Sequence, residues 1–137
     1  MRSYTMIVCK IVTVKIKEGA REIWSYTVGR GEVRYSEFYT TRPKEGCGLL
    51  CAFSSISSAM AFISGEMGLC PKNIIPMKIM EGCELWECIA EVVPDATVKD
   101  VYDSPTSKLL PADLPLGTVL CNSIRLIEVI GPERYNE

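Results

Sequence analysis

The sequence predicts a single α+β domain over residues 1–137, with a mainly antiparallel sheet of about six or seven strands and one principal helix. Hydrophobic residues make up 47% of the chain and the mean hydropathy is +0.14, which supplies enough apolar material for one core. Most apolar segments alternate with a period of two, whereas one segment, at about residues 55–65, has helical spacing. Residues 94–117 contain four prolines and are predicted to form a long surface loop.

Three strands are predicted in the N-terminal third of the chain. Residues 4–17 alternate as one long strand, and a change of apolar parity between Ile11 and Val12 indicates a bulge. Residues 23–28 and 33–40 flank the loop GRGE and predict a β-hairpin rich in aromatic residues. Lysines interrupt the apolar N-terminal stretch, so we expect no cleaved signal segment and a cytoplasmic protein.

The predicted helix follows a short buried strand. Residues 49–53 are a continuous apolar run, which is typical of a strand covered on both faces. Ser54 or Ser55 is placed to cap the free amides of the first helical turn. The apolar residues that recur at helical spacing are Ile56, Ala59, Met60 and Ile63.

The C-terminal half is less regular. Residues 74–80 contain a proline, which indicates an edge strand. Residues 118–130 predict two strands with a turn at 122–123, where asparagine and serine interrupt the apolar pattern. We expect the polar tail, 131–137, to be frayed.

Residues 84–93 fit two different elements. As a helix, the segment would place Glu84, Glu87 and Glu91 opposite an apolar stripe. As a strand, it would direct alternate residues to one face, and these are Trp86, Cys88, Ala90 and Val92. We prefer the strand because the run is short, follows a turn sequence and is rich in β-branched residues.

The absence of histidine excludes several kinds of active site. The chain contains no histidine, so it has no Ser–His–Asp or Cys–His nucleophile and no imidazole metal ligand. Its seven cysteines are an odd number and lie mainly in apolar runs. We interpret them as free thiols that fill space in a core, in a reducing compartment.

The charge of the chain excludes other partners. The formal net charge is −2, which predicts neither a nucleic acid nor an anionic membrane as a partner. No apolar run has the length of a membrane span. Residues 1–44 are basic and residues 81–103 are acidic, so we expect the two segments to be neighbours in the fold.

The preferred functional hypothesis is a non-catalytic binding or assembly module without a cofactor, which binds a protein partner or itself as a homodimer. Aromatic residues and arginine are enriched at the centres of protein interfaces. The predicted contact surface is the aromatic hairpin, and its residues are Tyr35, Phe38, Tyr39 and Arg30. Trp24 and Tyr26 of the same hairpin are expected to contribute more to the core.

Two alternatives remain from the sequence. The first is a nucleotide- or NAD-binding, transferase-like enzyme with candidate residues Arg30, Arg34, Glu84 and Glu87 in a cleft that the 94–117 loop closes. The second is a cysteine-ligated metal protein, although the spacing of Cys83 and Cys88 exceeds that of zinc knuckles. We therefore predict no metal ligands.

The order of elements resembles that of ADP-ribosyltransferase-like domains, with an aromatic hairpin, a Ser-capped helix after a strand, and a late strand that bears glutamates. The resemblance implies an early arginine, which Arg30 or Arg34 matches. The family's Ser-x-Ser strand is absent, and Glu84 and Glu87 lie one residue too far apart for its Glu-x-Glu motif. We assign no family on this resemblance.

Overall fold

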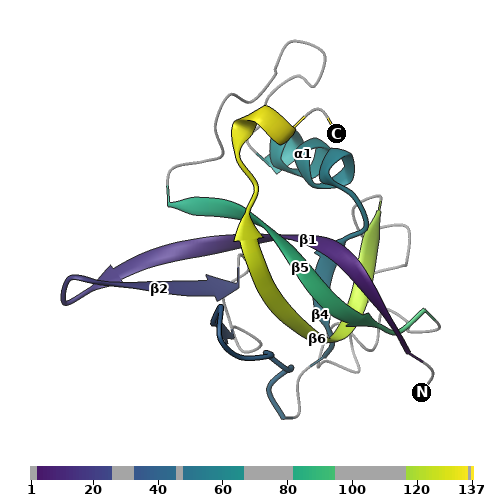
Figure 1. The fold of residues 1–137 in the computed structure, drawn as a ribbon, viewed down its shortest axis with the longest axis horizontal. Helices are drawn as coiled ribbons and strands as arrows, with labels where there is room; N and C mark the ends of the chain where they lie inside the picture. The colour runs from purple at the N-terminus through teal and green to yellow at the C-terminus, as the bar shows by residue number, and fades with distance from the viewer. Residues whose placement is uncertain (1–2, 26–32, 46–47, 67–81, 95–116, 136) are drawn as a thin grey trace.

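The fold is a six-stranded antiparallel sheet with one α-helix, seen in a computed structural model that describes residues 3–25, 33–45, 48–66, 82–94, 117–135 and 137 (Figure 1). The elements are β1 (Tyr4–Lys17), β2 (Ala20–Ser25), β3 (Arg34–Tyr35), β4 (Leu50–Phe53), α1 (Ile56–Glu66), β5 (Cys83–Val92), β6 (Thr118–Val129) and the 3-10 helix η4 (Pro132–Arg134). The predicted edge strand at 74–80 and residues 95–116 of the Pro-rich segment lie outside the described residues.

The sheet closes on itself. Its strand order is β3-β2-β1-β4-β6-β5, and β5 pairs back with β1. That closing pair is long, since it runs from Tyr4 opposite Val92 to Thr13 opposite Cys83. Strands β1, β4, β6 and β5 therefore form a ring with an inner and an outer face, and β2 and β3 extend it from β1.

Two apolar clusters occupy the two faces of the ring. The inner cluster contains Val8, Val12, Ile23, Val33, Tyr35, Leu50, Ala52, Trp86, Cys88, Ala90, Val92, Cys121, Ile124 and Leu126. The outer cluster lies under α1 and contains Cys9, Ile11, Phe53, Ile56, Ala59, Met60, Ile63, Leu85 and Ile130. The helix begins as predicted, because Ser55 Oγ accepts a hydrogen bond from the amide of Ser58 at 3.1 Å.

The expected bulge in β1 is absent from its pairing with β5. The register is continuous from Tyr4 to Thr13. All five residues 8–12 are buried, because the ring interior covers one face of β1 and the outer cluster covers the other. The apparent change of parity in the sequence therefore reflects burial of both faces.

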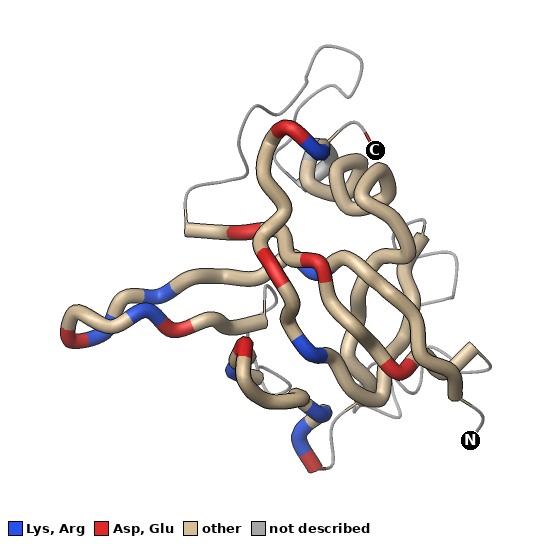
Figure 2. The backbone as a smooth tube through the Cα atoms, in the orientation of Figure 1, with Lys and Arg blue, Asp and Glu red and all other residues tan. Residues whose placement is uncertain are grey.

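The β1–β2 hairpin forms an arm, which we define as residues 14–22. Its turn has positive φ at both central residues, Glu18 (50°) and Gly19 (80°), which is the geometry of a type I′ turn. The pairing of β1 with β5 ends at Thr13, so the two strands of the arm continue beyond the ring as a ribbon (Figure 1). Both positively and negatively charged residues occur along the arm (Figure 2).

The predicted strand at 33–40 is shorter in the structure. β3 comprises Arg34 and Tyr35, which pair with Trp24 and Ile23 of β2. Residues 36–39 then form a tight turn, in which the Phe38 amide donates to Ser36 Oγ at 3.1 Å. A serine hydroxyl that bonds the amide two residues on favours a turn over continued strand pairing.

The prediction of two strands in residues 118–130 is wrong, since β6 is continuous. Its register against β5 shifts between Glu91 and Val92, and the partners step from Ser123 to Cys121. Asn122 is the extra residue at this irregularity, and its side-chain amide donates to Glu91 Oε1 at 2.8 Å. The polar residues therefore mark a β-bulge.

The C-terminal tail is ordered through Tyr135, in contrast to the expected fraying. Pro132 begins the 3-10 helix η4, and Arg134 in it pairs with Glu87 of β5 at 2.8 Å. Ile130, just before η4, is 1% exposed in the outer cluster. An apolar anchor and an ion pair thus attach the tail to the ring.

Candidate binding groove

Residues 84–93 form a strand, in agreement with the preferred prediction. β5 spans Cys83–Val92 and pairs with β1 on one side and β6 on the other. The four residues of the predicted core face are all buried, and these are Trp86, Cys88, Ala90 and Val92. The expected contact between the basic and acidic segments also occurs, because β1 pairs along β5.

A groove lies between β2 and the end of β6, over the buried indole of Trp86. Its volume is about 540 Å³, and it is lined by Arg21, Ile23, Glu37, Trp86, Ile127, Glu128 and Val129. Ile127 and Val129 are 43% and 46% exposed, which is unusual for aliphatic side chains beside a buried tryptophan. The end of β2 lies beside β6 in Figure 1, so the walls come from two separate parts of the sheet.

Glu84 organises the polar side of the groove. Its Oε1 atom accepts hydrogen bonds from Arg21 Nη2 at 2.7 Å and from Trp86 Nε1 at 3.1 Å. The charge of Arg21 is therefore largely balanced by Glu84. The other charged residues of the lining, Glu37 and Glu128, give the groove an apolar wall with an acidic rim.

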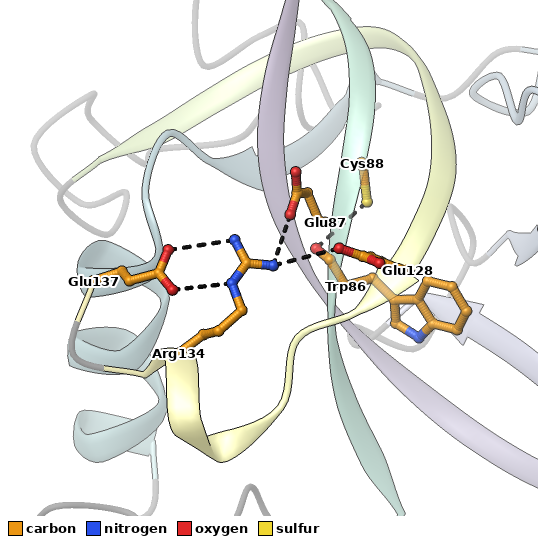
Figure 3. A network of polar contacts seen from close by, with 6 residues as sticks. All are labelled: Trp86, Glu87, Cys88, Glu128, Arg134 and Glu137. Atoms are coloured by element: carbon orange, nitrogen blue, oxygen red, sulfur yellow. Dashed lines mark hydrogen bonds and ion pairs between the residues drawn. The ribbon is translucent and has the colours of Figure 1, made fainter.

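The four candidate catalytic residues are not brought together. Arg34 pairs with Glu22 at 3.7 Å beside the β2–β3 ladder, and Glu84 lies on the inner face of β5. Glu87 lies on the outer face, where Arg134 pairs with it (Figure 3). Arg30 lies outside the described residues. Each of the two glutamates thus has its own arginine partner, on opposite faces of one strand.

The predicted contact surface is divided by the structure. Phe38 and Tyr39 are 80% and 72% exposed, at the turn that follows the groove residue Glu37. Tyr35, in contrast, is 2% exposed and belongs to the inner cluster, because its place in β3 directs it into the ring. Trp24 is half-buried with Lys15 over its ring at 4.7 Å, and Tyr26 lies outside the described residues.

Arg134 is the centre of an ion-pair network that borders the groove through Glu128 (Figure 3). Its guanidinium contacts Glu137 at 3.0 Å, Glu87 at 2.8 Å and Glu128 at 3.6 Å. The hydrogen bonds that Arg134 donates to Glu137 and Glu87 raise the pKa of Arg134. A guanidinium is permanently charged in any case, so this network holds η4 against β5 and β6 and supplies no titratable catalyst.

The buried thiols of Cys9, Cys88 and Cys121 are poor nucleophiles. Burial raises the pKa of Cys88 and of Cys121 to about 12, and burial together with Glu87 raises that of Cys9 to about 11. Because the thiolate is the reactive form, these cysteines act as small apolar side chains near neutral pH. In the part of the chain that the structure describes, no three His, Cys, Asp or Glu residues are grouped to hold a metal ion.

Sequence reasoning found Glu84 but missed the rest of the groove. Arg21, Ile127 and Val129 carry no motif, and their positions alternate like those of any strand. Only ring closure places β2 beside the end of β6.

Comparisons with known proteins give no relative. No family model, curated protein or solved structure matches the chain. Within the described ranges, no helix has the length and apolar character required to cross a membrane.

Proposed function

We propose that the protein is a non-catalytic binding and assembly module, and that the groove over Trp86 is its contact surface. The observation that carries this proposal is the pair of exposed aliphatic side chains, Ile127 and Val129, on the wall of the groove. Exposed apolar surface in a concave site is stabilised when a partner removes it from water. Phe38 and Tyr39, at the turn after Glu37, extend the apolar surface beside the rim.

The partner that suits this groove is an extended segment with alternating apolar and basic side chains. On one side, β6 pairs with β5 as far as Val129. On its other side, the last partner among the described residues is Thr41, opposite Ile124. Within the described part of the chain, residues 125–129 have no strand partner on this side, so a strand can add there by main-chain hydrogen bonds.

The charges of the groove select for basic side chains in that segment. Glu37 and Glu128 line the groove, where Arg21 is paired with Glu84 and Glu128 also contacts Arg134 at 3.6 Å. A lysine or arginine next to the apolar wall would meet these carboxylates, whereas an acidic side chain would be repelled. The free thiols among the described cysteines fit a reducing, cytoplasmic setting for such a module.

The arrangement of ionisable groups gives less support to an enzyme. A general acid and base require two groups across a cleft in unequal environments. Glu84 is tied to Arg21 and Trp86, and Glu87 is tied to Arg134 on the other face of β5. We therefore infer that Glu84 and Glu87 stabilise the fold through these contacts.

Selection from a phage-displayed library of random peptides tests the proposal. We expect enriched peptides to alternate apolar residues with lysine or arginine. Their affinity should fall roughly tenfold or more for Ile127→Asp, since a carboxylate in the apolar wall lacks a partner.

Ile89→Asp is the matched control, because Ile89 is 42% exposed on the outer face of β5, against 43% for Ile127. We expect this variant to bind selected peptides as the unmodified protein does. Selection of no peptide, or equal losses for the two variants, would contradict the assignment of the groove.

A further inference from the structure

The arm is an ordered element that stands away from the ring. A two-stranded ribbon alone is marginally stable in water, so an ordered one requires local support. The arm has this support from its type I′ turn, from Lys15 over the Trp24 ring at 4.7 Å, and from Arg21 paired with Glu84 at 2.7 Å. It therefore projects its tip in a defined direction (Figure 1).

The tip of the arm carries an exposed apolar residue. Ile16 is 65% exposed, and Lys17 beside it is also exposed. Ile16 lies opposite Arg21, and Val14 lies opposite Ile23, so the same face of the arm leads from Ile16 to the groove lining. Ile16 therefore offers an apolar contact at the tip of an ordered arm.

The arm also presents an open strand edge. β1 pairs with β5 only as far as Thr13, and on that side the Val14 amide donates a hydrogen bond to the carbonyl oxygen of Gly82 at 2.6 Å. Among the described residues, no strand pairs with Ile16 and Lys17 on the β5 side of the arm. This edge is the counterpart of the open edge at 125–129 of β6.

We propose that the groove of one copy receives the arm of a second copy, and that the exchange is reciprocal in a twofold-symmetric dimer. The inference rests on the proposed function, because it names the occupant of the same groove. Ile16 would pack on Ile127 and Val129 of the other copy, and Lys17 would lie near Glu37 and Glu128. Under twofold symmetry the contact between arm and groove occurs twice in the dimer, once for each copy.

Three properties of the chain favour a second copy over another partner. The arm has an apolar tip where the groove has an apolar wall. At the tip, Lys17 lies beside Glu18, and Lys17 is the residue that would meet the groove carboxylates Glu37 and Glu128, the second of which also contacts Arg134. The arm has an open strand edge, as does β6. The arm of the same copy extends away from its own ring, so it requires a partner to meet these features (Figure 1).

A charge-exchange experiment tests the dimer. Sedimentation equilibrium across the micromolar range should give a mass twice the 15.2 kDa of one chain. Lys17→Glu and the double variant Glu37→Lys/Glu128→Lys should each dissociate roughly tenfold more readily, since like charges then meet at both contacts. An equal mixture of the two should recover the dimer, because each arm then meets a groove of opposite charge.

Ile16→Asp separates this inference from the proposed function. It should weaken the dimer while leaving the groove intact, so that peptides selected on the groove still bind. Ile89→Asp should leave the dimer unchanged, and circular dichroism checks that each variant is folded.

A monomeric protein that binds selected peptides would overturn the arm exchange and retain the binding groove. A dimer that is insensitive to Ile16→Asp, or a mixture that does not recover, would also overturn the arm exchange. Loss of peptide selectivity at the groove would overturn the proposed function itself.

Discussion

The amino group of Lys10 lies 5.6 Å from the ring centroid of Tyr35, inside the closed sheet. Lys10 Nζ donates a hydrogen bond to the carbonyl oxygen of Cys51. The hydroxyl of Tyr35 is buried without a hydrogen-bond partner. The ring interior thus combines apolar packing with a lysine that bonds Cys51 and a phenol that, among the described residues, makes no hydrogen bond of regular geometry. Burial raises the pKa of Tyr35, and the nearby charge of Lys10 acts to lower it.

Removal of the Tyr35 hydroxyl is expected to stabilise the protein. A buried hydroxyl without a partner costs about 1–3 kcal/mol of desolvation, so Tyr35→Phe should raise the free energy of unfolding by roughly 1 kcal/mol. Urea denaturation at pH 7 measures the change. Tyr39→Phe is the control, because Tyr39 is 72% exposed and its hydroxyl reaches water in both states. A destabilised Tyr35→Phe protein would show that the hydroxyl has a partner.

Stability is expected to fall at alkaline pH because of the buried thiols. Burial raises the pKa of Cys88 and Cys121 from 9.0 to about 12, so the unfolded chain loses these protons first. Above pH 9 the unfolded state binds fewer protons than the folded state. The free energy of unfolding should therefore fall by up to about 1.4 kcal/mol per pH unit for each thiol, over the window from 9 toward 12.

Substitution of one thiol checks this slope. Cys88→Ala should remove the contribution of one thiol to the slope of the free energy of unfolding between pH 9 and 11. Val8→Ala, at another fully buried position of the inner cluster, should lower stability at every pH without changing the slope. Equal slopes for the Cys88→Ala and unmodified proteins would contradict the assignment.

Substitution of Glu18 by asparagine is expected to stabilise the turn of the arm. Glu18 has φ 50°, a conformation that costs a non-glycine residue free energy and that asparagine tolerates better. Glu18→Asn creates the Asn-Gly sequence preferred in type I′ turns and should stabilise the protein by about 0.5–1 kcal/mol. Thermal unfolding measures this effect.

Gly19→Ala provides the opposite case in the same turn. A Cβ at Gly19 meets no atom within 4 Å, so any loss reports its φ of 80° alone. We expect a loss of about 1–2 kcal/mol. An unchanged melting temperature for both turn variants would mean that the arm does not unfold cooperatively with the rest of the protein.

Loss of the Arg134 side chain is expected to release the C-terminal tail. Arg134→Ala removes the contacts to Glu87, Glu128 and Glu137, so amide hydrogen exchange should accelerate across η4 and the melting temperature should fall. Arg125→Ala, at an exposed arginine of β6, is the control and should leave exchange in η4 unchanged. Unaltered protection in the Arg134→Ala protein would show that Ile130 alone anchors the tail.

Much of the local structure was predictable from sequence because its signals are short in range. Serine capping located the start of α1, and alternation of apolar residues identified the buried face of β5. The same local logic failed at Asn122, where polar residues looked like a turn although a bulge and a bond to Glu91 keep β6 continuous. A pattern of polarity does not distinguish a turn from a bulge, because both interrupt alternation.

The candidate site also combines features that the sequence predicts with features that it does not. Glu84 was named from the sequence only as a candidate residue of an enzyme, and its partner Arg21 lies 63 positions earlier in the chain. Tyr35 looked like an interface residue and is instead core, since β3 follows β2 around the ring. Exposure of a side chain depends on what the rest of the chain places over it, which alternation alone does not specify.

By itself, the sequence determined the strand periodicity, the single helix, the exclusion of imidazole chemistry and the apolar role of the cysteines. The tertiary structure decided that β5 returns to β1, and so decided which faces are inner, where the groove opens and how far the arm projects. The physical reason is that side-chain alternation is encoded residue by residue. Strand closure instead depends on pairing between segments that lie some 80 positions apart, such as Val8 with Cys88.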